Sequence, residues 1–337
     1  MTVKKRPTIY DVAERAGVSK SLVSLVLRDS PRVSDAKREA VLEAVTALNY
    51  TPSRLAAGLA GTRTRSVGVI IDDFSNLWFV EALAGLRTAL AEGGYALSVA
   101  DASLNAHLGI DPIEAFRALR VDGIVLAGEA SAPAVARSGV PAVVLGVRDL
   151  GAELAELPVI ASDEAAGGRL ATMHLAVQGH RDIACVSAPG ASAARRERGY
   201  CDAIAELGLT PTVVRAPDTG EAAAREVAAE LLARAESAQA PRPTAVFAVN
   251  DPMAVGVIGA ARELGIAVPG DLSVVGYDDS PIAAYGLVSL TSVSGDPREL
   301  GEAAGQVLIA KLEGGATQIA SRSFTPRLVA RGSVAAY

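Results

Sequence analysis

Short apolar runs alternate with helical stretches along most of this chain, from residue 66 towards its end. The earlier runs are SVGVII, YALSVA, VDGIVLAG and PAVVLGV, and after Gly179 come DIACVSA, TVVRA, TAVFAVN and LSVVGYDD. Continuously apolar strands separated by helices are typical of parallel sheets that helices cover on both faces. Two successive sets predict an α/β core of two similar lobes, with sites in the cleft at the carboxyl ends of the strands.

The first 65 residues differ from the rest in charge. They hold 12 Lys and Arg against six Asp and Glu, whereas residues 66–337 hold 20 against 32. A small basic segment on a large acidic body indicates a module that binds a polyanion such as DNA. A basic arm that is merely solvated has the same charge, so the residue pattern has to decide between them.

The pattern in the basic segment predicts a helix-turn-helix. One helix is expected from about residue 9 to 16, and Gly17 suits the tight turn after it. Ser19 is a natural N-cap for a second helix, from about 20 to 27, and a third helix follows Ser34. The alternative is an ordinary three-helix domain. The inward-facing residues of the first two helices have the spacing of a helix-turn-helix: Ile9, Val12, Ala13, Val23 and Val26.

The second helix of this motif enters the major groove with its first residues against base edges. Lys20 can donate to guanine acceptors, Ser21 can pair with several edges, and Leu25 can only make apolar contact, for example with a thymine methyl. Around them lie residues placed to hold phosphates or the start of the helix: Thr8, Tyr10, Ser19, Ser24, Arg28, Arg32 and Ser34.

This segment resembles the lactose-repressor/galactose-repressor (LacI/GalR) family of bacterial transcriptional regulators. The resemblance is carried by DVAERAGVS, the RVS before the third helix, LNYTP and LAAGLAG, and it continues to about residue 331. It implies a DNA-binding headpiece, a hinge and a periplasmic-binding-protein-like core, over 1–50, 51–65 and 66–337. The lobes of that core would comprise about 66–161 with 296–322, and 162–293 with 323–337.

The stretch RLAAGLAG, residues 54–61, is too weak a helix to form alone. Two turns are marginal in water, and Gly58 costs roughly another 1 kcal/mol relative to Ala. The resemblance implies a hinge helix over 53–61 that forms when two protomers bind DNA and pushes a leucine into the minor groove. That leucine is Leu59 here, and Arg54 is placed with the DNA contacts. A plain flexible linker is the alternative.

Polar and aromatic residues at strand ends suit a hydroxylated small molecule. Trp78 and Phe79 follow the first strand and can stack on a sugar ring or a heterocycle, although core packing is the alternative. Arg148, just beyond the fourth strand, would suit an acidic or phosphorylated ligand. By the resemblance, the family's effector contacts fall on Arg196, with Ser192 four residues earlier, and on Asn250 and Asp278. Asp251, before Pro252, is interpreted as part of a helix start rather than of the site.

Three residues depart from the family's pattern. Leu25 stands where many members carry an arginine that reads the operator, so a different operator preference is expected. Gly146 and Gly295 stand where an acidic residue and a glutamine occur in members of the family, and these losses are expected to enlarge the pocket.

Other classes of function find little support in the sequence. No dinucleotide-binding, Walker or nucleophile-elbow motif is present, and the three histidines lack metal-ligand spacing, so we expect no enzyme, cofactor or metal. No run of 18 apolar residues and no secretory signal occurs, and Cys185 and Cys201 indicate two reduced thiols. A cytoplasmic protein without a membrane partner is expected.

Together these features predict a repressor of a carbohydrate-utilisation operon. It would bind a pseudo-palindromic operator as a homodimer, since the chain carries no C-terminal leucine heptad to join dimers, and a sugar-like effector would act by shifting the population of lobe arrangements. A purine, nucleoside or phosphorylated effector is the alternative, as is a ligand-binding protein without operator specificity. Whether the effector is an inducer or a corepressor stays open.

Overall fold

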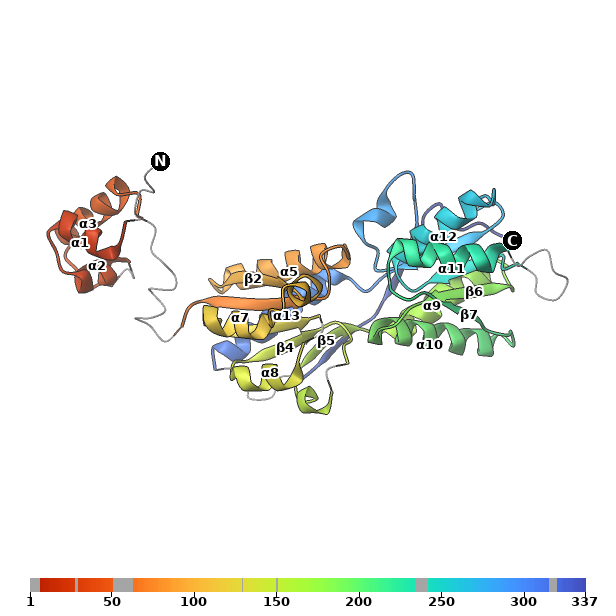
Figure 1. The fold of residues 1–337 in the computed structure, drawn as a ribbon, viewed down its shortest axis with the longest axis horizontal. Coiled ribbons are helices and arrows are strands. Elements are labelled where there is room, and N and C mark those ends of the chain that lie inside the picture. Colours follow the sequence, from red (N-terminus) through yellow and green to blue (C-terminus); the bar gives the residue numbers. More distant parts are fainter. Residues whose placement is uncertain are drawn as a thin grey trace. The chain divides into compact units, whose positions relative to one another are not determined.

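The chain forms two compact units, Met1–Thr64 and Arg65–Tyr337, in a computed structural model of the protein (Figure 1). The structure describes residues 7–27, 30–50, 63–128, 130–149, 151–233, 242–314 and 320–337. The predicted hinge over 53–61, with Arg54 and Leu59, and the predicted phosphate contact Arg28 lie outside these residues.

The first unit contains the predicted helix-turn-helix. Helix α1 (Ile9–Ala16) begins with a capping box, in which Thr8 and Asp11 each satisfy the other's backbone N–H. Gly17 ends the helix in the left-handed conformation, with φ 63°, which a residue with a side chain rarely adopts. Helices α2 (Lys20–Leu27) and α3 (Asp35–Ala47) follow. The buried side chains of the three helices and of the turn before α3 form one small core: Val12, Ala13, Val23, Val26, Val33, Val41 and Ala44.

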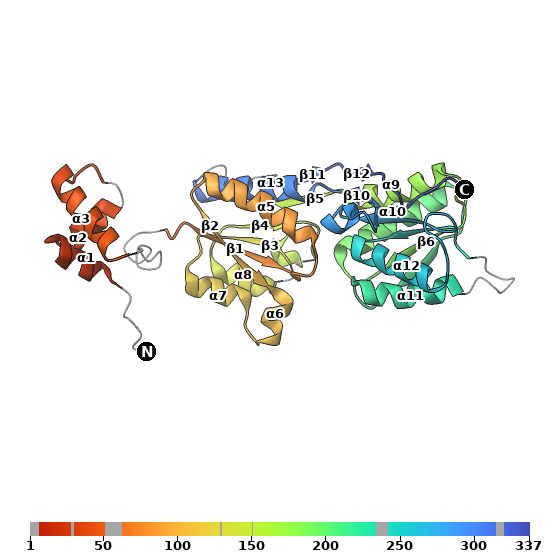
Figure 2. The same cartoon turned by 90° about the horizontal axis from the view of Figure 1, so that it is seen from above.

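The second unit contains two six-stranded sheets in the part that the structure describes, with strand orders β11-β5-β4-β3-β1-β2 and β12-β10-β9-β8-β6-β7. The strand pairs are parallel except that β12 runs antiparallel to β10. We call the first sheet with its helices lobe 1 and the second lobe 2 (Figures 1 and 2). The near-continuous burial along most strands is the reason why the sequence reads as unbroken apolar runs.

Lobe 1 is a sheet between two layers of helix. Its strands are β1 (Ser66–Ile71), β2 (Ala96–Asp101), β3 (Gly123–Ala127), β4 (Ala142–Leu145), β5 (Val159–Ser162) and β11 (Arg322–Phe324). Its helices are α5 (Trp78–Glu92) and α13 (Pro297–Leu312), which pack together on one face, with α6 (Ala102–His107), α7 (Pro112–Leu119), α8 (Ala132–Ser138) and a 3-10 turn at Ala152–Leu154 elsewhere (Figure 2).

Lobe 2 repeats this plan. Its strands are β6 (Ile183–Ser187), β7 (Thr212–Arg215), β8 (Ala245–Ala248), β9 (Ser273–Tyr277), β10 (Thr291–Ser294) and β12 (Arg327–Val329). Its helices are α9 (Glu164–Val177) and α10 (Ala191–Glu206) on one face and α11 (Glu221–Ala233) and α12 (Asp251–Glu263) on the other, with a 3-10 turn at Pro281–Ala284 (Figure 2).

Within the described residues the chain crosses between the lobes three times: after β5, after β10, and between β11 and β12. The first two crossings follow Ser162 and Ser294. The third lies after Phe324, so the limit expected between 322 and 323 falls inside β11. The pairing of this strand with β5 is a long-range contact that local sequence does not reveal.

Helices α9 and α10 approach each other at two glycines. A Cβ on Gly168 would lie 2.0 Å from the carbonyl oxygen of Arg196, and one on Gly199 would lie 1.9 Å from that of Ala165. The two backbones are therefore in direct contact. This contact fixes where α10 places its side chains relative to the rest of lobe 2.

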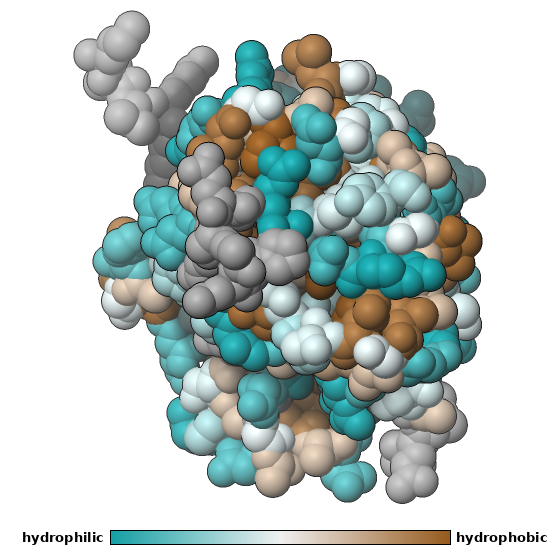
Figure 3. Space-filling model, turned by 90° about the vertical axis from the view of Figure 1, so that its right-hand side faces the viewer, coloured by the Kyte–Doolittle hydropathy of each residue, from teal (hydrophilic) through white to brown (hydrophobic). Residues whose placement is uncertain are grey.

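Surface composition varies over the molecule. The face drawn in Figure 3 carries several small hydrophobic patches separated by hydrophilic side chains. No helix in the described part of the chain has the length and apolar character needed to span a membrane.

Candidate functional site

The predicted DNA-contacting residues of the headpiece gather around the start of α2. Ser19 accepts a hydrogen bond from the Leu22 backbone N–H at 3.3 Å, and Lys20 and Ser21 beside it are exposed. Lys20 Nζ lies 3.3 Å from the hydroxyl of Tyr10 and 5.0 Å from the centre of its ring. The tyrosine of α1 thus orients the lysine of α2.

Other predicted headpiece contacts are less accessible than the sequence suggested. Leu25 and Ser24 are half-buried, and Leu25 packs against the headpiece core. The hydroxyl of Thr8 donates to Asp11 at 2.7 Å and so serves the helix cap. Arg32 and Ser34, in the turn before α3, are exposed.

Arg148 lies at the carboxyl edge of the lobe 1 sheet. Its guanidinium donates to the carbonyl oxygen of Ala127, at the end of β3, and its Nη1 lies 3.3 Å from Asp72 Oδ2, just after β1. Its Nε is buried and has no hydrogen-bond partner among the described residues. Burial lowers the pKa of Arg148, and Asp72 partly offsets this effect. Arg148 is therefore turned inward onto its own lobe.

The position of Gly146 explains this conformation. A Cβ there would lie 3.6 Å from Arg148 Nη2 and 3.7 Å from the indole of Trp78. The guanidinium and the indole thus occupy the space beside Gly146. The pocket enlargement expected from the missing acidic side chain is reduced, because Arg148 fills part of that space.

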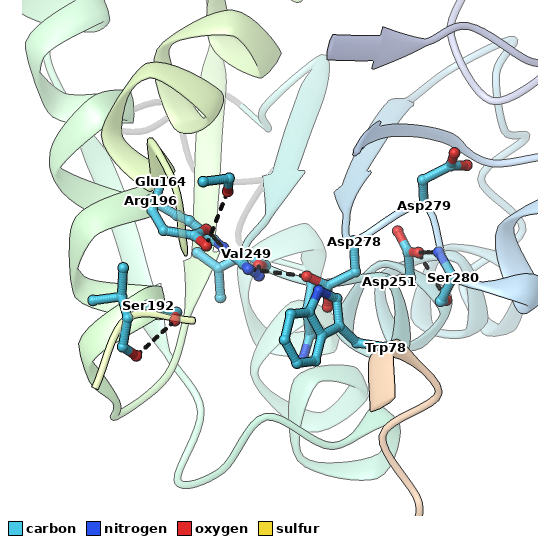
Figure 4. Close-up of polar contacts among 12 residues, drawn as sticks. Trp78, Glu164, Ser192, Arg196, Val249, Asp251, Asp278, Asp279 and Ser280 are labelled. Carbon is cyan, nitrogen blue, oxygen red and sulfur yellow. Dashed lines mark hydrogen bonds and ion pairs between the residues drawn. The ribbon is translucent and has the colours of Figure 1, made fainter. Parts of the chain in front are cut away.

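Arg196 is the centre of the buried polar cluster on lobe 2 (Figure 4). Its Nε donates to Glu164 Oε2 at 2.5 Å, its Nη1 to the carbonyl oxygen of Val249 at 2.7 Å, and its Nη2 lies 2.9 Å from Asp278 Oδ1. The ring of Tyr277 lies below it, 3.7 Å from ring centre to guanidinium carbon. Burial opposes the charge of Arg196, but Asp278 and Glu164 outweigh burial and raise its pKa.

Asp278 completes the cluster from the end of β9. It has φ 102° and is only 4% exposed. Burial raises its pKa to about 7, although Arg196 pulls the pKa down. Its neighbour Asp251 is fully buried, accepts hydrogen bonds from Ser280 and Ser292, and has a pKa that burial raises to about 6. Asp251 is thus a structural carboxylate that ties α12 to the ends of the strands.

Asn250 and Ser192 each make hydrogen bonds to the backbone. Asn250 caps α12 by accepting from the Met253 N–H at 2.9 Å, and its Nδ2 donates to the carbonyl oxygen of Thr219 at 3.1 Å. Ser192, near the start of α10, donates to the carbonyl oxygen of Val147 at 3.3 Å and so joins lobe 2 to lobe 1.

Two expectations from the sequence do not agree with the geometry. Phe79 is 3% exposed and belongs to the core of lobe 1, because α5 turns it inward while Trp78, edge-on to it at 5.1 Å, stays half-buried. A Cβ on Gly295 would lie 2.6 Å from Ser162 Oγ. Because residue 295 has no side chain, the crossing after β10 lies directly against Ser162, at the end of β5 where the first crossing begins. The space is therefore filled by Ser162 and does not enlarge the pocket.

Sequence reasoning missed Glu164 and Asp72. Each is an acidic residue directly after a buried strand or one residue beyond it, a position at a strand end that Asp278 also occupies. Among the described residues, no group of three His, Cys, Asp or Glu side chains is arranged to hold a metal ion.

Comparison with known proteins identifies both units. Residues 8–53 match the profile "Bacterial regulatory proteins, lacI family", and residues 172–334 match "Periplasmic binding protein-like domain". The HTH-type transcriptional repressor PurR of Vibrio campbellii is 34% identical over 334 residues, which cover 97% of this chain and 98% of that protein. The chain belongs to the LacI family. It is accordingly a DNA-binding transcriptional regulator and not an enzyme.

Solved structures of LacI-family regulators have the same architecture. The lac repressor dimer bound to operator and the anti-inducer ONPF superposes with a TM-score of 0.82 at 28% identity, over 98% of this chain and 100% of that one. The complex of the transcriptional regulator CelR with cellobiose gives a TM-score of 0.69 at 29% identity, over 97% and 100%. The helical headpiece and the two-lobed core with parallel sheets are thus confirmed as the LacI-family fold.

Proposed function

We propose that this LacI-family protein is a repressor that binds a pseudo-palindromic operator as a homodimer and responds to an uncharged, sugar-like effector between its lobes. The observation that carries the effector class is the set of charged side chains that the two lobes bring together. Asp72, Glu164 and Asp278 face two guanidinium groups, Arg148 and Arg196, and the single tryptophan of the chain lies beside them.

The balance of charge favours a neutral ligand over a phosphorylated one. Both guanidinium groups already pair with carboxylates, and the three carboxyl groups outnumber them, with Asp278 carrying part of its charge near neutral pH. A phosphate would meet this negative excess at short range in a region of low dielectric, which is costly. Hydroxyl groups both donate to carboxylates and accept from guanidinium N–H groups, so a sugar fits the same set of partners without that cost.

Relatives support two effector classes. One solved relative is a complex with cellobiose, which favours a sugar, and the half-buried indole of Trp78 can stack on a sugar face. The same indole can stack on a nucleobase, and a curated relative at 34% identity is named PurR. A purine-type effector is therefore the second candidate at this cleft.

On the DNA side, we assign base contacts to Lys20 and Ser21, with Leu25 limited to apolar contact. A half-buried leucine cannot donate to a base edge, so operator positions opposite Leu25 are read by shape or by a thymine methyl. The hinge residue Leu59 is assigned to the minor groove, and Arg54 to the DNA contacts, on the sequence alone. A relative solved as a dimer on its operator supports the homodimer.

The test begins with duplexes selected by the full chain from random-sequence DNA. Fluorescence anisotropy then gives operator affinity at fixed salt with cellobiose, a series of monosaccharides, the same sugars as phosphates, and adenine and hypoxanthine. We expect one uncharged sugar to change affinity and its phosphate to have little effect. A response to nucleobases alone would establish the second candidate, and a response to sugar phosphates alone would contradict the charge argument.

A further inference from the structure

Two of the crossings between the lobes touch at a serine and a glycine. The first crossing follows Ser162 at the end of β5, and the second contains Gly295 after β10. A Cβ on Gly295 would lie 2.6 Å from Ser162 Oγ and 2.9 Å from its Cβ, so a larger residue would displace the serine. The first crossing also bonds to the third, since the Asp163 N–H donates to the Phe324 carbonyl oxygen at 2.9 Å. Movement of one lobe against the other has to be accommodated at these crossings.

Glu164 links this contact to the effector arginine. Ser162 Oγ donates to Glu164 Oε1 at 3.2 Å, and Arg196 Nε donates to Glu164 Oε2. The glutamate is 6% exposed and uses both carboxylate oxygens. Through Arg196 the polar contacts continue to Asp278 at the end of β9 (Figure 4). A continuous series of buried contacts thus runs from the crossing to the cleft.

The local structure does not need Glu164 to start its helix. The N-cap of α9 is Asp163, whose side chain accepts from the Ala166 N–H at 3.0 Å. Burying a carboxylate is costly unless it is paired, and the pairing here is with Arg196. The described contacts of Glu164 therefore point to the arginine and the crossing, and not to helix capping.

We propose that Glu164 is the positioning residue that carries the state of Arg196 to the lobe crossing at Ser162 and Gly295. The proposal rests on the proposed function, because it assumes that an effector engages Arg196 or Asp278. A ligand that forms new hydrogen bonds with Arg196 or Asp278 changes the hydrogen bond that Arg196 donates to Glu164. Glu164 then shifts against Ser162, and the crossings take up the lobe arrangement that sets operator affinity.

The charge of Glu164 is what the test removes. The charged groups near Asp278 within lobe 2 are Arg196 of α10, Glu164 of α9 and Asp251 of α12. Arg148 interacts with Asp278 from lobe 1. The next residue, Asp279, is paired with Arg331. Glu164 and Asp251 both raise the pKa of Asp278, and Arg196 lowers it. A neutral residue at 164 leaves Arg196 to Asp278 alone, so the pKa of Asp278 falls.

The experiment compares Glu164→Gln with wild-type protein and with a matched control. The control is Glu206→Gln, because the Arg169–Glu206 pair, at 2.7 Å, joins the same two helices but is about half exposed. Operator affinity of the ligand-free full chain is measured on the duplex selected by the wild type, between about pH 5.5 and 8.5, together with the melting temperature of each variant. None of the three histidines, at 107, 174 and 180, lies in the headpiece.

We expect the wild-type dissociation constant to change with a midpoint near the pKa of Asp278, about 7. Glu164→Gln moves that midpoint down by about 0.5 in pH or more, because it removes a charge that raises the pKa. Glu206→Gln gives the wild-type profile. The proposal would be overturned if the dissociation constant of the wild type did not change with pH, or if the midpoint of Glu164→Gln did not move. It would also be overturned if Glu164→Gln lost operator affinity by the same factor at every pH and had a lower melting temperature. Failure of the wild type to select any duplex would instead contradict the repressor function itself.

Discussion

At the scale of single residues, the protein buries charged side chains in its interior, where a charge is costly. Arg196, Glu164 and Asp278 are each less than one tenth exposed and satisfy one another. Removing one member leaves the others buried without a partner, which is far more damaging than removing an exposed pair. Breaking the cluster is therefore expected to destabilise lobe 2, and the cluster contains the groups that we propose contact an effector.

We expect Arg196→Ala to lower the free energy of unfolding by about 3–5 kcal/mol, because two buried carboxylates lose their cation. Arg169→Ala, which breaks the exposed pair with Glu206 on the same helices, is expected to cost about 1 kcal/mol or less. Urea unfolding of both variants beside the wild type measures the difference. Equal losses for the two would contradict the assignment of Arg196 as the buried centre.

The raised pKa of Asp278 makes a second prediction. Its folded pKa, about 7, lies above the value for an unfolded aspartate, so the folded state binds the proton more tightly. The contribution of Asp278 to stability is therefore present at low pH and is lost as pH rises from about 4 to 7. Asp278→Asn keeps the acceptor oxygen but cannot titrate. Its unfolding free energy should fall less over this window than that of the wild type, and identical slopes would refute the shift.

At the scale of elements, the sequence predicted well what local pattern controls. The apolar runs marked the long strands, and Gly17 and Ser19 marked the turn and cap of the helix-turn-helix, because these features depend on backbone geometry and nearby side chains. It did not predict β5, β10, β11 or β12, and the pairing partner of β11, for example, is β5, about 160 residues away. It placed Phe79 in the cleft because periodicity does not fix how α5 rotates on its sheet, and it missed Glu164 because Arg196 is its partner only in the folded chain.

The close approach of α9 and α10 predicts the result of filling it. Gly168→Ala puts a methyl group 2.0 Å from the Arg196 carbonyl oxygen, so the helices have to separate. We expect a loss of about 1–3 kcal/mol in unfolding free energy and a weaker response to effector, since Arg196 moves with α10. Gly286→Ala, in open space within the same lobe, is the control. Unchanged stability of Gly168→Ala in thermal or urea unfolding would contradict this packing.

At the hinge, in contrast to Gly168, replacing a glycine with alanine is expected to have a favourable effect, namely stronger binding to the operator. Gly58 lies outside the described residues, and its role rests on the sequence. Replacing it with alanine favours the helix by about 1 kcal/mol for each chain, so operator affinity should rise about fivefold or more. Binding to a scrambled duplex of the same length should not change, because non-specific binding depends on phosphate contacts. Equal affinity of Gly58→Ala and wild type for the operator would favour the plain linker.

At the scale of the whole molecule, regulation requires that effector binding and DNA binding be coupled energetically. We propose that the crossings between the lobes provide the route in the core, and a ligand alters operator affinity only to the extent that it binds one lobe arrangement better than the other. Such coupling is reciprocal: the factor by which effector changes operator affinity equals the factor by which operator changes effector affinity.

That reciprocity is the most direct test of the account. Trp78 is the single tryptophan of the chain and lies beside Arg148 and Gly146, so its fluorescence can report an effector that binds at the proposed site. The measurement is a titration of Trp78 fluorescence with the sugar that changes operator affinity, made with and without saturating operator duplex. We predict that the two effector dissociation constants differ by the same factor as the operator affinities. Effector binding that operator DNA leaves unchanged would contradict regulation through this cleft.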